Sequence, residues 1–270
     1  KSRNLVSIRL LDQIGISTLI NYAGRFGFKA DEMPRDLSLA LGTHAVTPLE
    51  LATAYASLAN GGYRVYPYLV DRVENFDREE IYQARPVTVC QDCEEEEETN
   101  EPVEEELSMA EILGEAEEPE LPRAERIMEE CVNFIINSMM QDVIKFGTGR
   151  RARVLEREDI AGKTGTTNGP TDAWFSGFNP DVVATAWLGF DQNLELGKAE
   201  FGGKAALPMW IDFMRVALAD SADLARPVPE CIVNVRIDPE TGLLPRPGQP
   251  DAIFEYFREE NVPTESVSPR

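Results

Sequence analysis

The chain has 270 residues, with 48 acidic and 26 basic side chains and a formal net charge of −22. This length allows one large domain or two small ones with a substantial core. The negative charge excludes nucleic-acid binding as a principal activity, because a phosphate backbone would be repelled. No apolar run reaches the roughly 18 residues of a membrane span. The sequence begins at Lys1 without a methionine or signal peptide, so we expect a fragment of a longer protein.

The excess charge is concentrated in one segment. Between residues 91 and 122 there are 15 Asp or Glu residues and no Lys or Arg, and removing them leaves 33 acidic against 26 basic residues, a net charge of −7. Like charges repel one another and little apolar surface is available for burial, so we expect residues 90–122 to form an acidic, disordered insertion. An interaction tail that binds cations or a partner is the alternative interpretation.

The four cysteines lie at positions 90, 93, 131 and 231. Cys90 and Cys93 form a Cys-x-x-Cys pair, but the chain has no second such pair, and its single histidine, His44, is distant in sequence. A four-ligand zinc site is therefore not expected, and the pair is interpreted as incidental to a loop. We expect a structural or surface role for His44.

Helices are predicted first near the N-terminus. Apolar residues at helical spacing predict a helix over residues 5–14 that ends at Gly15, and Ser17 is expected to cap a second short helix that runs towards Phe26. The capping box Thr47-Pro48-Leu49-Glu50 predicts a third helix, which stops at residues 60–62. Two later amphipathic helices are expected over residues 127–143 and 207–218.

Strands are predicted between and after these helices. The expected segments are a hairpin over residues 63–82, strands over 159–163, 172–178 and 182–190, and a final hairpin that begins with 232–237. Neighbouring strands this close in sequence pair antiparallel. The prediction is an α/β (α+β) fold, with one antiparallel sheet and helices packed on both faces. Trp174 and Trp187 are expected to pack in the core, and Asp172 to orient a cleft group or cap its strand.

The sharpest local signal is the segment Gly162-Lys163-Thr164-Gly165-Thr166-Thr167. It does not fit a phosphate-binding loop, because position 157 is Arg where that motif needs Gly, and because the segment is predicted as a strand. A strand edge of this sequence suits an extended peptide that ends in a carboxylate. Lys163 supplies a cation, Gly165 allows close approach, and the two following threonines supply hydroxyls. The alternative is a strand end that turns through glycine beside an exposed lysine.

A second motif, Ser2-Arg3-Asn4, lies near the N-terminus, directly before a predicted helix, and can be considered together with Lys-Thr-Gly. A Ser-x-Asn followed later by Lys-Thr-Gly reproduces, in order, two of the three sequence elements of penicillin-binding proteins and β-lactamases. The third element, Ser-x-x-Lys, carries the nucleophile, and no serine of this chain has a lysine three residues later.

The whole pattern resembles the bifunctional (class A) penicillin-binding proteins, most of all the 1a type of Gram-negative bacteria. The segments that carry the resemblance are residues 1–7, 47–52, 59–62, 161–168, 172–175, 187–191 and 207–210. The resemblance implies a penicillin-binding protein/β-lactamase-like fold. It also implies a partial transpeptidase domain over residues 1–89 and 123–263, interrupted by the acidic insertion and followed by a tail over 264–270.

The resemblance implies roles for individual residues. Ser2 would relay a proton to the leaving amine, Asn4 would position the catalytic lysine, and Lys163 would polarise Ser2 and attract the substrate carboxylate. Residues 164–167 (Thr164, Gly165, Thr166 and Thr167) would bind substrate, with the Thr166 hydroxyl on the carboxylate and its N–H in the oxyanion hole. The turn Gly147-Thr148-Gly149 would border the cleft.

The resemblance also implies the reaction and its setting. The expected activity is peptidoglycan D,D-transpeptidation through a serine acyl-enzyme, with stem peptides and β-lactams as ligands and with no cofactor and no metal. The expected location is the periplasmic face of the inner membrane, with the nucleophile, the glycosyltransferase part and the membrane anchor upstream and an outer-membrane lipoprotein as activator. A D,D-carboxypeptidase or β-lactamase relative and a non-catalytic stem-peptide-binding module are the alternatives.

Overall fold

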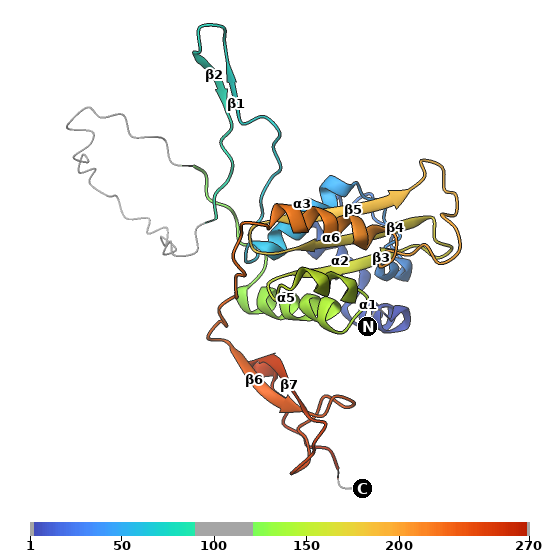
Figure 1. Ribbon diagram of the computed structural model, residues 1–270. Helices are drawn as coiled ribbons and strands as arrows, with labels where there is room; N and C mark the ends of the chain where they lie inside the picture. Colours follow the sequence, from blue (N-terminus) through green and yellow to red (C-terminus); the bar gives the residue numbers. More distant parts are fainter. Residues whose placement is uncertain (1–2, 90–120, 269–270) are drawn as a thin grey trace, which may run out of the picture. The chain divides into compact units, whose positions relative to one another are not determined.

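The computed structural model describes residues 3–89 and 121–268 (Figure 1). Ser2, Cys90, Cys93 and nearly all of the acidic segment therefore lie outside the described residues. The chain divides into two compact units, one of residues 1–64 with 126–270 and one of residues 65–125. Among the helices that the model describes, none has the length and apolar character needed to cross a bilayer.

Within residues 3–89 and 121–268, the α-helices all belong to the larger unit. They are α1 (Asn4–Ile14), α2 (Ile16–Arg25), α3 (Pro48–Ala59), α5 (Glu130–Lys145) and α6 (Ala206–Ala217). Three short 3-10 helices accompany them, η1 (Leu37–Leu41), η2 (Arg150–Leu155) and η3 (Glu259–Asn261).

Two predicted helix ends are confirmed and one is wrong. Thr47 and Glu50 form the complete capping box at the start of α3, and α1 ends at Gly15 as its sequence predicts. Ser17, however, does not cap α2. The helix begins one residue earlier, at Ile16, with Gly15 at the N-cap position and no side-chain cap. Gly15 serves both helices because its φ of 87° allows a sharp change of direction between them.

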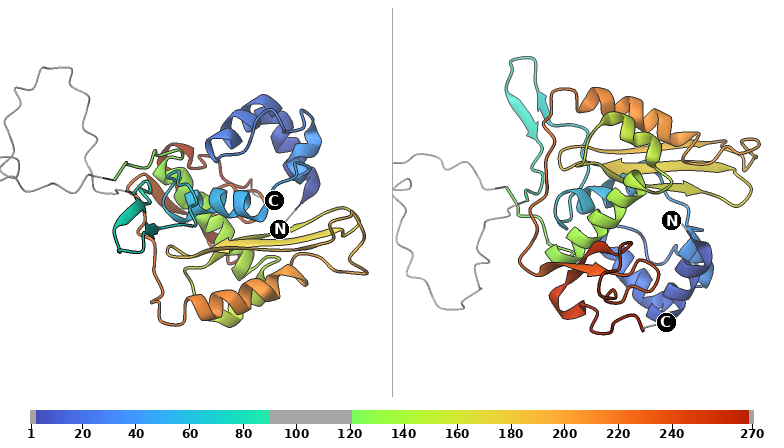
Figure 2. Two further views of the ribbon diagram at one scale, coloured as in Figure 1. Left: turned by 90° about the horizontal axis from the view of Figure 1, so that it is seen from above. Right: turned by 60° about the horizontal axis from the view of Figure 1, so that its bottom comes forward.

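The central sheet contains β3 (Ala161–Thr166), β4 (Asp172–Phe178) and β5 (Val183–Gly189), paired antiparallel in the order β3-β4-β5. Alternate residues of β4 face opposite sides. Phe175 packs on Trp210 of α6, whereas Phe178 packs on Tyr55 of α3. Figure 2 shows α6 and α3 on opposite faces of this sheet. The predicted α/β fold, with an antiparallel sheet and helices on both faces, is confirmed.

The remaining strands do not extend this sheet. The pairs are β1 (Arg72–Glu74) with β2 (Glu80–Gln83) in the smaller unit, and β6 (Ile232–Ile237) with β7 (Ile253–Arg258) in the larger one. The expectation of a single sheet is therefore wrong, and the first hairpin is shorter than residues 63–82. One reason is that Tyr63 belongs to the larger unit, where the Arg126 guanidinium lies 4.5 Å from its ring centroid.

A disulfide between Cys131 and Cys231 fastens the C-terminal hairpin to the first turn of α5. Two further contacts join the same elements. Phe134 and Tyr256 pack edge to face with centroids 5.1 Å apart, and Arg258 pairs with Glu129 at 3.4 Å. The sequence alone did not indicate which cysteines pair.

Candidate functional site

The Lys-Thr-Gly segment forms β3, an edge strand of the central sheet. Within the described chain its ladder partner is β4, with Lys163 opposite Ser176 and Gly165 opposite Trp174. Because residues directly opposite each other share a face of the sheet, these four residues look the same way. The Lys-Thr-Gly segment therefore lies on an edge strand, as the sequence predicts, and the larger buried cluster, which contains Phe175 and Trp210, lies on the other face of the sheet. Peptide binding at this edge stays a prediction.

A cavity of about 850 Å³ opens over this face. Its walls come from β3 to β5 on one side and from α2, η1 and the start of α3 on the other. All five predicted site residues of the Lys-Thr-Gly segment, Lys163, Thr164, Gly165, Thr166 and Thr167, line it, and so do His44, Tyr55, Asp172, Trp174 and Trp187. The sequence thus located one wall of the cavity correctly, and the structure adds the opposite wall.

Lys163 is half-buried in this cavity. Its Nζ donates a hydrogen bond to the carbonyl oxygen of Thr164 at 2.8 Å, and burial lowers the pKa of the amine. Tyr55 on the opposite wall is more deeply buried, which raises the pKa of its hydroxyl to about 12. At neutral pH the cavity therefore presents a tyrosine that stays protonated and a lysine that loses its proton more readily than a solvated one.

The turn at the end of α5 reaches β3 through its middle residue. The amides of Gly147 and Gly149 both donate to the carbonyl oxygen of Val143, at 3.1 and 2.9 Å, and this closes the turn. The hydroxyl of Thr148 then lies 2.8 Å from that of Thr164. This turn was predicted to border the cleft. Its residues are not part of the cavity lining, and Thr148 contacts a strand residue that is, so the role of the turn stays a prediction.

Thr167 lines the cavity but its hydroxyl is engaged within the chain, whereas Asn4 lies outside the cavity lining. The Thr167 hydroxyl accepts hydrogen bonds from the amides of Thr171 and Asp172, both at 3.0 Å, so it holds the β3–β4 turn. Asn4 is exposed as the first residue of α1 and is not part of the cavity lining. Its predicted role beside Lys163, like that of the undescribed Ser2, stays a prediction.

Two tryptophans were predicted to be core residues but line the cavity instead. Trp174 is half-buried and Trp187 is 36% exposed, and their ring centroids lie 5.8 Å apart. Asp172 accepts a hydrogen bond from the Trp187 indole at 2.9 Å, which is the orienting role that its position suggested. Large aromatic residues on strands look the same in sequence whether they face a core or a cleft, so no sequence signal separated the two.

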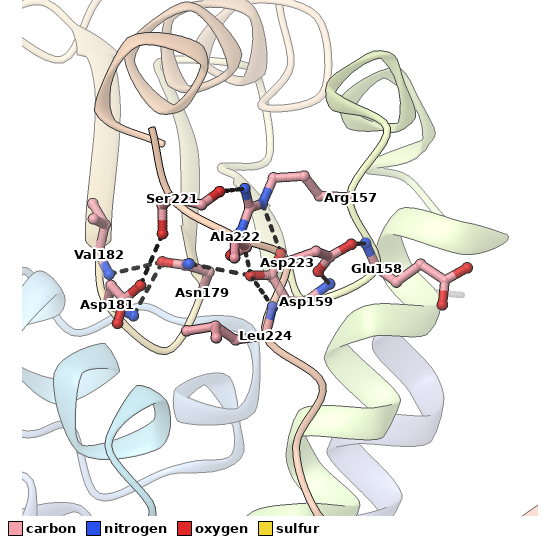
Figure 3. Close-up of polar contacts among 10 residues, drawn as sticks. All are labelled: Arg157, Glu158, Asp159, Asn179, Asp181, Val182, Ser221, Ala222, Asp223 and Leu224. Carbon is pink, nitrogen blue, oxygen red and sulfur yellow. Dashed lines mark hydrogen bonds and ion pairs between the residues drawn. The ribbon is translucent and has the colours of Figure 1, made fainter. Parts of the chain in front are cut away.

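A buried polar network fixes the start of β3, four residues before Lys163 (Figure 3). The Asp159 side chain is fully buried and accepts hydrogen bonds from Arg157, at 2.8 and 2.6 Å, and from Asn179 at 3.2 Å. Burial by itself would raise the pKa of Asp159, but the hydrogen bonds from Arg157, Asn179 and the Leu224 amide hold it below its usual value.

The same network also holds the segment that follows α6. Arg157 donates to the carbonyl oxygens of Ser221 and Ala222, and Asp223 accepts from the amides of Glu158 and Asp159. These contacts tie residues 221–224 to the strand that carries Lys163, as Figure 3 shows.

Comparison with family models gives two matches. Residues 1–209 match the penicillin binding protein transpeptidase domain, and residues 228–268 match the C-terminal domain of penicillin-binding protein 1A. The second match covers the β6–β7 hairpin that the disulfide fastens to α5.

Individual proteins are similar over nearly the whole chain. Penicillin-binding protein 1A of Pseudomonas aeruginosa is 47% identical over 97% of the chain, and that of Vibrio cholerae is 37% identical over 99%. The chain spans about a third, 34%, of the length of each. A crystal structure of penicillin-binding protein 1A from Haemophilus influenzae superposes with a TM-score of 0.84 and 33% identity, over 99% of this chain and 40% of that one.

Proposed function

Because the chain belongs to the family of penicillin-binding protein transpeptidase domains, we propose that it forms part of a peptidoglycan D,D-transpeptidase that β-lactams acylate. The observation that carries the proposal is the edge strand β3, which lines a cavity of about 850 Å³ with Lys163 and Thr166, within a family match over residues 1–209. The strand presents a cation and hydroxyls along one line, which suits an extended peptide with a terminal carboxylate.

The proposed chemistry proceeds in two halves. A serine oxygen attacks the carbonyl carbon of the D-Ala-D-Ala bond, and the terminal D-Ala leaves as an amine that takes up a proton. An acceptor amine then attacks the ester, forms the cross-link and releases the serine. In this scheme Ser2 relays the proton and Asn4 positions the catalytic lysine. Lys163 polarises Ser2 and attracts the terminal carboxylate, which the Thr166 hydroxyl binds.

The nucleophile of this scheme lies outside residues 1–270. No serine of the chain is followed by a lysine three residues later, so we propose that the Ser-x-x-Lys element precedes Lys1 in the full-length protein. We further propose that this protein is bifunctional, carries a glycosyltransferase part, works at the periplasmic face of the inner membrane and responds to an outer-membrane lipoprotein.

Labelling with a fluorescent penicillin, followed by a denaturing gel, tests the proposal. We expect a covalent band on the full-length protein and none on the 270-residue chain. Lys163→Ala in the full-length protein should slow labelling on the order of 10²-fold, because a group that moves or polarises protons is lost. Lys198→Ala, at an exposed lysine outside the cavity lining, is the matched control and should label at the normal rate. Unchanged labelling of Lys163→Ala would make this residue a surface lysine.

Stem-peptide turnover separates the proposed transpeptidase from a hydrolytic relative. With an acceptor amine present, a transpeptidase yields the cross-linked product, whereas a D,D-carboxypeptidase yields the shortened peptide alone.

A further inference from the structure

Gly202 is buried in the loop that joins β5 to α6, and it contacts both α6 and β3. Its amide donates a hydrogen bond to the Thr166 Oγ1 at 3.0 Å. Its carbonyl oxygen accepts from the amides of Ala206 and Leu207, at 3.2 and 2.9 Å, at the start of α6. That helix is fixed in turn by Trp210, which is 1% exposed. One glycine therefore connects a buried helix to a hydroxyl of the edge strand.

The position leaves no room for a side chain. A Cβ on Gly202 would lie 2.5 Å from the carbonyl oxygen of Gly165 and still closer to that of Trp174. Both obstacles are backbone atoms of paired strands, so they cannot move aside as a flexible side chain would. Any larger residue would push the loop away from β3 and break the hydrogen bond to Thr166.

The direction of this hydrogen bond determines what the Thr166 hydroxyl can do. A backbone N–H only donates, so Thr166 Oγ1 must be the acceptor. The proton of the hydroxyl is then left for another oxygen, and the described part of the chain offers it no acceptor. Thr166 is exposed and lines the cavity, so its proton is available to a ligand there.

We propose that Gly202 is a positioning residue that makes the Thr166 hydroxyl a hydrogen-bond donor to the terminal carboxylate of the ligand. The proposal rests on the proposed function and adds to it a residue far along the chain from the Lys-Thr-Gly motif. Because Gly202 acts through Thr166, substitution of Gly202 should weaken binding of ligands that carry a carboxylate more than binding of ligands that lack one. The substitution should have this effect only in a protein that retains the Thr166 hydroxyl.

A comparison of two ligands tests this in the full-length protein. Acylation rates are measured for a penicillin with its free carboxylate and for the methyl ester of the same penicillin. We expect the wild type to prefer the carboxylate form, and Gly202→Ala to reduce that preference about tenfold, the worth of one charge-assisted hydrogen bond. Gly24→Ala, at a helical position with nothing within 4 Å of the added Cβ, should keep the preference. An unchanged preference in Gly202→Ala would overturn the proposal.

A double-variant comparison separates positioning from a general structural effect. Thr166→Val should lose the preference to the same extent, and Gly202→Ala combined with Thr166→Val should lose no more than Thr166→Val alone. Additive losses in the preference would show that Gly202 acts independently of Thr166 and would overturn the proposal.

Hydrogen exchange tests the contact without altering Gly202, should its alanine variant fail to fold. The Gly202 amide should be protected in the wild type and in Thr166→Ser, and should exchange faster in Thr166→Val. Equal protection in all three would overturn the proposal. Hydrogen exchange can be measured without acylation. A full-length protein that no penicillin labels would therefore contradict the proposed function, whereas the exchange rates would still show whether Gly202 contacts Thr166.

Discussion

The hydroxyl oxygens of Thr148 and Thr164 lie 2.8 Å apart, and they join the turn after α5 to the strand that carries Lys163. The residues are 16 positions apart in sequence, and the buried η2 residue Ala152 lies in the chain between them. This contact fixes the distance between the end of α5 and β3, the strand that lines the cavity.

Thr148→Val should slow acylation by penicillin about tenfold, the worth of roughly one hydrogen bond. The valine keeps the shape of the side chain but leaves the Thr164 hydroxyl without this partner, so the edge strand is held less firmly. Thr148→Ser retains the hydroxyl and is the control, with a rate close to that of the wild type. Stopped-flow acylation rates of the full-length protein measure both. Equal rates for the Val and Ser variants would show that the hydroxyl pair has no part in the reaction.

Asp159→Asn should destabilise the domain by about 3 kcal/mol, because it leaves the largely buried Arg157 guanidinium, 12% exposed, without this charged partner. Asp212→Asn is the matched control. The Asp212 side chain is 74% exposed, and its pair with Arg215 should contribute less than about 1 kcal/mol. Urea unfolding at pH 7 measures the two losses, and a similar small loss in both variants would mean that the network of Figure 3 does not stabilise β3.

The same carboxylate predicts a pH dependence. The folded protein holds the pKa of Asp159 below its usual value of 3.8, so the stabilisation is present above that value. It is lost as the pH falls through the lowered folded-state value. We therefore expect the difference in unfolding free energy between wild type and Asp159→Asn to be constant from pH 7 to about pH 5 and to shrink below pH 4. A difference that grows on acidification would contradict the assigned direction.

Local rules predicted the parts of this fold that local sequence determines. β4 begins and ends at the predicted residues, Asp172 and Phe178, and the capping box of α3 is complete. Lys163 lies on β3, a strand that the threonines of its motif favour. In each case the decisive interactions lie within a few residues along the chain or in the neighbouring strand.

The features that the sequence did not reveal depend on distant contacts. Cys131 and Cys231 are separated by 100 residues, and no local sequence signal links one to the other. Gly202 follows a polar loop and looks like an ordinary turn glycine until β3 is placed against it. A strand pattern also leaves open which sheet a strand joins, which is why β6 and β7 form a separate pair.

Removing the disulfide should destabilise the protein by about 3 kcal/mol, because the cross-link closes a loop of about 100 residues in the unfolded chain. The double variant Cys131→Ala/Cys231→Ala should also release the C-terminal hairpin from α5 and expose it to limited proteolysis. A reducing agent should lower the stability of the wild type by a similar amount and leave the double variant unchanged. If the reductant affects both proteins alike, the effect comes from Cys90 and Cys93 or from elsewhere in the full-length protein.

Deleting residues 91–120 should leave folding and acylation nearly unchanged, because the segments that flank the deletion are already hydrogen-bonded to each other. The amide of Thr88 donates to the carbonyl oxygen of Pro122 at 2.9 Å, and the amide of Ala124 donates back to that of Thr88 at 2.8 Å. A connection of about four Gly and Ser residues can bridge such a gap at little entropic cost. The melting temperature of the full-length protein should change by no more than about 2 °C, which corresponds to less than about 1 kcal/mol.

The control replaces the same segment with a Gly/Ser chain of equal length. A fall of several degrees in both variants would show that the acidic segment contributes to stability, and a loss of acylation without such a fall would assign it a role in the reaction.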